Sequence, residues 1–267
     1  MAMSSPLRES DTDVNSYFKE NDTPEPKVRR LSFQDKQIRY VSSGLEPSDS
    51  TIAILFIHGA PGSSDSFYAY LADSTLRRQS HMITVDRLGY GYSDYGNAET
   101  DIQKQALPLA ELINQTPAKD WLIVSHSYGC AIAGVLAIQQ NSKIKANLML
   151  CPVIDPNNEK MFYISSWPSK PVIKNLFSKA FQVASYEKMS HVEELEKIEG
   201  LWSQTEIPTT ILHGAKDWIA PVENANYFKN FISDELLDVR IYPDLSHFIP
   251  WEQADLVINE LVTLIEE

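Results

Sequence analysis

The sequence around Ser127 contains residue types that are suited to nucleophilic catalysis. An apolar run, residues 122–124, stops at the sequence Ser-His-Ser-Tyr-Gly, residues 125–129, and a second apolar run follows. A serine hydroxyl is a weak nucleophile at neutral pH, so it needs a base within hydrogen-bond reach and a third group that orients the base. The chain has six histidines as candidate bases. We therefore expect Ser127 to attack a carbonyl carbon if a histidine and a carboxylate reach it.

The segment around Ser127 predicts a sharp change from strand to helix. The small residues Ser125 and Gly129 flank Ser127, and residues 130–138 are apolar on every side, as in a buried helix. A strand that turns abruptly into a helix holds the middle residue in strained backbone geometry and lifts its side chain clear of the sheet. Ser127 is therefore the predicted nucleophile.

Residues 125–129 resemble the nucleophile elbow of the α/β-hydrolase family, usually Gly-x-Ser-x-Gly, with Ser125 in place of the first glycine. The resemblance covers about residues 28–267. It implies an α/β-hydrolase fold, with a mostly parallel central sheet of about eight strands, helices on both faces and a small helical cap inserted after strand 6. A serine nucleophile separates the chain from the similar haloalkane dehalogenases and epoxide hydrolases, which use aspartate.

The resemblance also indicates which histidine is the base. In the family the catalytic histidine comes last in chain order, in the loop after the last strand, and His247 occupies that place. His126 adjoins Ser127, but we expect the elbow to turn its side chain away. We expect His58 and His213, at strand ends, to brace their loops by hydrogen bonds.

The family's acid usually follows the seventh strand, where this chain has Asp217. Its role would be to fix the tautomer of His247 and to stabilise the imidazolium that forms. Some relatives carry the acid after the sixth strand instead, which makes Asp155 the alternative. A loop aspartate is more often a turn or capping residue, so Asp217 is the preferred prediction.

Acyl transfer also needs donors for the tetrahedral oxyanion. The resemblance implies two backbone amides, that of Tyr128 at the start of the elbow helix and that of Ala60 in the turn His-Gly-Ala-Pro-Gly, residues 58–62. The segment Asp-Arg-Leu-Gly-Tyr-Gly-Tyr-Ser-Asp, residues 86–94, also resembles a family motif, and we interpret Asp86 and Ser93 in it as structural.

The elements that position these residues alternate between strand and helix, which favours a doubly wound sheet. Strands are predicted at residues 28–33, 38–41, 51–57, 82–85, 121–124, 146–150, 209–212 and 239–242. Helices are predicted at residues 14–19, 67–76, 102–115, 130–138 and 254–265.

The alternation divides the chain into three parts: a polar N-terminal extension, residues 1–27; a core, residues 28–151 and 207–267; and a helical cap, residues 152–206. The cap segment is too long for a connecting loop, and we expect it to lie over the carboxyl ends of the strands. It is rich in aromatic residues, namely Phe162, Tyr163, Trp167, Phe177, Phe181, Tyr186 and Trp202.

Composition narrows the possible partners. The chain has 23 Lys and Arg against 36 Asp and Glu, and its net charge of −13 repels phosphate backbones and anionic headgroups. We therefore expect no nucleic acid partner. We expect Cys130 and Cys151 to be free core residues, and neither a metal nor an organic cofactor is expected.

The predicted localisation depends on two kinds of segment, membrane spans and secretory signals. No run of 18 apolar residues predicts a membrane span, and no basic start with an apolar stretch predicts a secretory signal. The cytoplasm is the default expectation, and a signal or anchor removed from the N-terminus stays open. The sequence does not indicate an oligomeric state.

Taken together, the resemblance implies a serine hydrolase that forms an acyl-enzyme on a small to medium, largely apolar carboxylic ester or lactone. Residues 58–62 also resemble the proline iminopeptidases, although Ala60 and Tyr128 depart from that pattern. A carbon–carbon bond hydrolase is a further alternative. A ligand-binding receptor with little turnover is the alternative from a different class.

Overall fold

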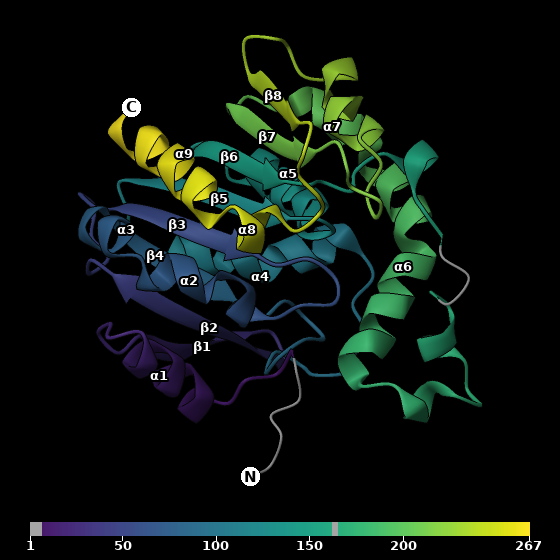
Figure 1. Ribbon diagram of the computed structural model, residues 1–267, viewed down its shortest axis with the longest axis horizontal. Helices are drawn as coiled ribbons and strands as arrows, with labels where there is room; N and C mark the ends of the chain where they lie inside the picture. Colours follow the sequence, from purple (N-terminus) through teal and green to yellow (C-terminus); the bar gives the residue numbers. More distant parts are fainter. Residues whose placement is uncertain (1–6, 162–164) are drawn as a thin grey trace.

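The chain folds around one eight-stranded sheet (Figure 1). The computed structural model describes residues 7–161 and 165–267. Neighbouring strands follow the order β1-β2-β4-β3-β5-β6-β7-β8; β2 pairs antiparallel with β1 and β4, and the other pairs are parallel. The strands are β1 (Lys27–Phe33), β2 (Lys36–Gly44), β3 (Ile52–Ile57), β4 (Ser80–Val85), β5 (Asp120–His126), β6 (Ile144–Leu150), β7 (Thr209–Gly214) and β8 (Leu237–Tyr242). The predicted, mostly parallel sheet is confirmed.

Helices cover both faces of the sheet (Figure 1). The α-helices are α1 (Asp11–Glu20), α2 (Tyr68–Ala72), α3 (Ser74–Gln79), α4 (Ile102–Gln115), α5 (Gly129–Gln139), α6 (Lys179–Ile198), α7 (Glu223–Tyr227), α8 (Ile249–Glu252) and α9 (Ala254–Glu266). Helices α1, α2, α3 and α9 pack on one face, and α4, α5 and α7 pack on the other. No helix in the described ranges is long and apolar enough to cross a membrane.

Each face of the sheet has its own hydrophobic core. In the central strand β3, Leu55 and Ile57 belong to the core under α4 and α5, whereas Ile54 and Phe56 belong to the core under α2 and α9. All four side chains are fully buried. Burial on both faces explains why this strand is a continuous apolar run, and it fixes the strand ends that carry the site.

The N-terminal extension is docked on the second of these cores. Ser10 caps α1 in a capping box with Asp13, and the side chains of Val14 and Phe18 are fully buried. Asp11 forms an ion pair with the buried guanidinium of Arg39 at 2.9 Å. The described part of the extension is therefore a packed helix.

One predicted helix is divided in the structure. Phe67 ends a 3-10 helix (Ser64–Phe67), and residues 68–76 form α2 and the start of α3, because Asp73 is extended between them, at φ −61° and ψ 126°. Its carboxylate accepts hydrogen bonds from the amides of Thr75 and Leu76 and so begins a new helix. Apolar residues on both sides of Asp73 hide this break in the sequence pattern.

The chain between β6 and β7, called here the β6–β7 connection (residues 152–206), contains mainly helical turns. They are the 3-10 helices η2 (Pro156–Asn158), η3 (Trp167–Ser169), η4 (Lys174–Leu176) and η5 (Glu199–Gln204), and the long helix α6. Trp202 packs against α5 in the core, whereas Phe181 and Tyr186 are exposed; Phe162 and Tyr163 lie outside the described residues. Its role as a separate cap stays a prediction.

Candidate active site

The turn from β5 into α5 has the geometry that the sequence predicts for Ser127. Ser127 is in the left-handed region, at φ 54°, and its side chain is buried. A Cβ atom on Gly129 would lie 2.6 Å from the carbonyl oxygen of His58, and one on Gly59 would lie 3.0 Å from Ser127 Cβ. The turn after β3 therefore lies tightly against the elbow: backbone atoms leave no room for a Cβ at Gly129, and little room remains at Gly59.

Two main-chain amides at this junction are free. In the described part of the chain, neither the amide of Tyr128 nor that of Ala60 donates a hydrogen bond to a protein group. The amide of Cys130, two residues after Tyr128, donates to the carbonyl of Ser127 at 3.0 Å. The first peptide of α5 and the turn after β3 thus present unpaired donors beside Ser127.

Asp217 and His247 are joined in the loops after β7 and β8. His247 Nδ1 donates to Asp217 Oδ2 at 2.6 Å, and both residues are buried. Asp217 Oδ1 accepts hydrogen bonds from the amides of Ile219 and Ala220 at 2.9 and 2.8 Å. Burial alone would raise the pKa of Asp217, but the hydrogen bond and the charge of His247 outweigh it and hold that pKa below its usual value. The carboxylate therefore stays ionised and orients the imidazole.

The alternative acid, Asp155, has a different environment. Its carboxylate oxygens accept from the amide of Asn157 at 2.8 Å and the side-chain amide of Asn158 at 2.6 Å. It begins the 3-10 helix η2 as an N-cap. The structure therefore brings Asp217, and not Asp155, to His247.

The other predicted histidines brace loops. His126 Nε2 donates to the carbonyl of His247 at 2.9 Å, and its ring contacts that of His247 at 4.7 Å between centroids. Burial, followed by the charge of His247, lowers the pKa of His126 to about 3, so its ring is neutral. His58 Nδ1 donates to the carbonyl of Gly59 at 2.7 Å, and His213 Nε2 donates to that of Ala220 at 3.1 Å. His126 thereby ties the His247 loop to the elbow.

Sequence reasoning missed a charged pair beside the elbow. Arg87 follows β4, Glu187 lies on α6, and their side chains form a buried ion pair with Nη1 and Oε1 2.7 Å apart. Glu187 occupies the same helix face as the buried residues Val183 and His191, at intervals of four. A glutamate within an otherwise buried stripe is the signal that marks this position in the sequence.

Cys151 lies close to Asp217 and His247, and these three form a cluster of potential metal ligands within the described ranges, with ligand atoms within 4.8 Å of one another. Burial raises the pKa of the Cys151 thiol, which donates to the carbonyl of Ser246 at 3.5 Å. Within this cluster the Asp217 carboxylate is bonded to His247 at 2.6 Å, so its oxygen orients the imidazole.

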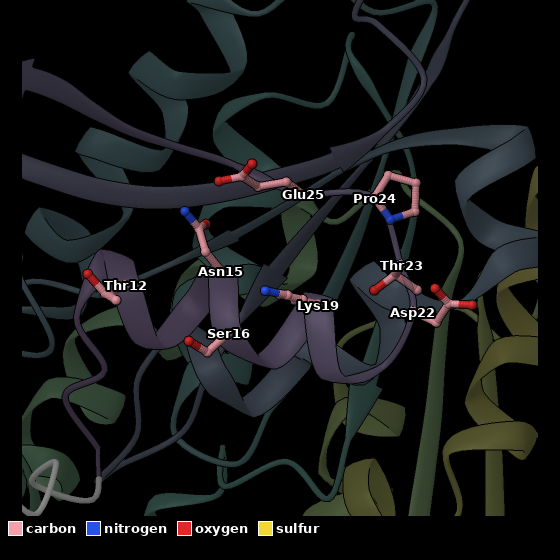
Figure 2. A pocket seen from close by; sticks show the side chains of 8 residues that line it. All are labelled: Thr12, Asn15, Ser16, Lys19, Asp22, Thr23, Pro24 and Glu25. Atoms are coloured by element: carbon pink, nitrogen blue, oxygen red, sulfur yellow. The ribbon is translucent and has the colours of Figure 1, made fainter. Parts of the chain in front are cut away.

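A groove with a volume of about 640 Å³ lies elsewhere, beside α1 (Figure 2). Its lining side chains are Thr12, Asn15, Ser16, Lys19, Asp22, Thr23, Pro24 and Glu25, all from α1 and the segment after it. Most of them are exposed. None of the residues predicted to do chemistry lines this groove, so it is distinct from the candidate active site.

Comparison with known proteins agrees with this architecture. Residues 52–170 match the model of the α/β-hydrolase fold family. A non-heme haloperoxidase of Rhodococcus erythropolis is 25% identical over 255 residues, which cover 80% of this chain and 92% of that protein. A probable lysophospholipase of Arabidopsis thaliana, BODYGUARD 1, is 31% identical over 115 residues, which cover 40% of this chain and 24% of that protein.

Solved structures are similar over most of the chain. A crystal structure of a putative aryl esterase from Burkholderia cenocepacia has a TM-score of 0.71 at 19% identity, and the match covers 90% of this chain and 98% of that one. A membrane phospholipase A has the same TM-score at 16% identity, over 96% of this chain and 90% of that one. With the sheet order and the elbow described above, these matches show that the chain has the α/β-hydrolase fold.

Proposed function

We propose that this protein is a serine hydrolase in which Ser127 is the nucleophile, His247 the base and Asp217 the acid. The observation that carries the proposal is the buried 2.6 Å hydrogen bond between His247 and Asp217, held by His126 against the elbow of Ser127. A base oriented by a carboxylate is what a serine hydroxyl needs to become reactive.

The reaction proceeds in two steps. Ser127 Oγ attacks the carbonyl carbon of the substrate while His247 Nε2 takes the hydroxyl proton. The oxyanion of the tetrahedral intermediate accepts hydrogen bonds from the amides of Ala60 and Tyr128. The leaving group departs with the proton from His247, and water then attacks the acyl-enzyme with His247 again as base, which releases the acid and restores Ser127.

The substrate we propose is a largely apolar carboxylic ester or lactone of small to medium size. Aromatic side chains stand beside both catalytic loops: Trp218 follows Asp217, and Phe248 follows His247. Trp218 is 58% exposed and Phe248 39% exposed, so both offer apolar surface beside the catalytic loops. The similar proteins include a putative aryl esterase and a probable lysophospholipase, in agreement with an ester substrate.

A panel of short and long acyl esters, lactones and prolyl amides tests this function. We expect turnover of esters by the wild-type protein, little turnover of prolyl amides, and loss of ester turnover by about 10⁶-fold in Ser127→Ala. Preferential hydrolysis of prolyl amides would favour an iminopeptidase instead. Binding of these compounds without turnover would favour a receptor.

A further inference from the structure

The peptide group between Gly59 and Ala60 is held from its carbonyl side. Its N–H is one of the two proposed oxyanion donors, and its carbonyl oxygen accepts two hydrogen bonds. His58 Nδ1 donates to it at 2.7 Å, and Arg87 Nη2 donates to it at 3.0 Å. Because a peptide group is planar, donors that fix the carbonyl also fix the direction of the N–H.

Arg87 forms two further hydrogen bonds with the same turn. Its Nε donates to the carbonyl of His58 at 2.9 Å, and its own amide donates to His58 Nε2 at 3.0 Å. The second contact holds His58 in the tautomer whose Nδ1 carries the proton. One arginine therefore forms three hydrogen bonds to the turn after β3.

The same guanidinium reaches the second proposed donor residue. Its carbon lies 4.9 Å from the ring centroid of Tyr128 and 4.8 Å from that of Tyr90. A guanidinium that contacts two aromatic rings has little freedom to tilt. Arg87 therefore contacts both proposed donor sites: the carbonyl of Gly59, whose peptide group carries the Ala60 N–H, and the ring of Tyr128.

Glu187 of helix α6 holds Arg87 in this orientation. Its two carboxylate oxygens accept from Nη1 at 2.7 Å and Nη2 at 3.2 Å, and Gln105 Nε2 donates to it at 2.9 Å. The hydroxyl of Tyr90 donates to the same carboxylate. Burial alone would lower the pKa of Arg87, but Glu187 outweighs it and raises that pKa above its usual value. All these groups are buried.

A buried ion pair of this kind adds little net stability, because desolvation offsets the attraction. What it provides is a fixed geometry. We propose that Arg87 is a positioning residue that directs the Ala60 amide towards the oxyanion. Glu187, which holds Arg87, makes helix α6 of the β6–β7 connection part of the same arrangement. This inference rests on the proposed function, since it assigns Arg87 a role in that reaction.

Two features make the arrangement catalytically useful. A carbonyl that accepts from a charged donor polarises its peptide, so the N–H at the other end becomes a stronger donor. The turn also needs no adjustment when the oxyanion forms, because its groups are fixed beforehand.

The test compares Arg87→Lys with Arg39→Lys. Lysine keeps the positive charge beside Glu187, but one ammonium group cannot also donate hydrogen bonds to the carbonyls of both His58 and Gly59. Arg39 is the matched control, because it is equally buried and pairs with the buried Asp86 at 3.2 Å. For R87K we expect kcat for an aryl ester to fall about 10- to 100-fold with KM within about threefold. For R39K we expect unchanged kcat and KM.

The second readout is inhibition by a trifluoromethyl ketone, which forms a tetrahedral oxyanion adduct with the serine. Its Ki should rise in R87K by about the same factor by which kcat/KM falls. If R87K does not fold, the variant Glu187→Gln tests the proposal instead. Its neutral amide holds Arg87 less firmly than the carboxylate does, so kcat should fall about three- to tenfold.

Folded R87K with the kcat and Ki of R39K would overturn the role of Arg87. If R87K does not fold, unchanged kcat in E187Q does the same. Ester turnover in the wild type separates these results from failure of the proposed function. A wild-type protein without turnover of any ester would overturn both.

Discussion

The two halves of the candidate site are built in different ways. The nucleophile half consists of Ser127, Tyr128 and the turn at residues 58–60, and the base half consists of Asp217 and His247. In the nucleophile half the proposed working groups other than the Ser127 hydroxyl are main-chain amides, set by a φ of 54°, by glycine contacts and by the hydrogen bonds of Arg87 to the turn. In the base half the working groups are side chains, set by hydrogen bonds to Asp217 and to the carbonyl of His247.

This difference follows from what each half must do. Donors for an oxyanion are useful when they do not move or change charge, and backbone locked by close packing meets that need. A base must gain and lose a proton, so it needs a partner that fixes its tautomer and stabilises the imidazolium that forms. The nucleophile half should therefore be sensitive to added atoms, and the base half to lost hydrogen bonds and to pH.

The largest effect is expected in the base half, from Asp217→Asn. The amide removes the charge that stabilises the imidazolium and favours the wrong tautomer of His247, so kcat should fall about 10⁴-fold. Steady-state kinetics with an aryl ester measures it. Asp155→Asn is the matched control and should change kcat little, because asparagine also caps η2. The reverse ranking would move the acid to Asp155.

A smaller loss is expected in the nucleophile half, from Gly129→Ala. The added Cβ would lie 2.6 Å from the carbonyl oxygen of His58 and 2.7 Å from that of Ile57, so the turn after β3 must move away. Displaced donors should lower kcat about 10- to 100-fold. Gly200→Ala is the control, because nothing lies within 4 Å of its added Cβ. Equal kcat in both variants would refute the tight junction.

The smallest effect is a dependence of stability on pH. The pKa of His126 is about 3 in the fold against an ordinary value of 6.5, so unfolding takes up a proton between these values. Its contribution to stability is fully present above pH 6.5 and is lost as pH falls towards 3. The free energy of unfolding should therefore decrease by up to about 1.4 kcal/mol per pH unit from this histidine.

Urea unfolding at several pH values between 7.5 and 5 measures this slope. His126→Asn should have a shallower slope than the wild type, since one proton fewer is taken up on unfolding. His58 contributes in the same direction, because burial and the charge of Arg87 lower its pKa as well. Identical slopes in the two proteins would show that His126 is not held neutral.

The sequence predicted most of the fold because its signals are local. Continuous apolar runs marked the central strands, and the elbow was recognisable from the small residues around Ser127. The division between α2 and α3 was missed, because a single capping aspartate outweighs a continuous helical pattern there. The sequence pattern does not indicate where α1 docks, since its partners on the sheet are distant in sequence.

The same distinction applies to the site. Asp217 and His247 were predicted to meet from the order of the family's motifs, and they do meet. The ion pair between Arg87 and Glu187 was missed, because 100 residues separate its partners and neither belongs to a catalytic pattern. Contacts between the core and the β6–β7 connection depend on tertiary packing that no local pattern reports.

Covalent labelling with a fluorophosphonate probe tests the central claim most directly. The account predicts one phosphonyl adduct per chain, on the peptide that contains Ser127, and no adduct in a folded Ser127→Ala variant. An unlabelled wild-type protein, or equal labelling of the variant, would contradict the claim that Ser127 is an activated nucleophile.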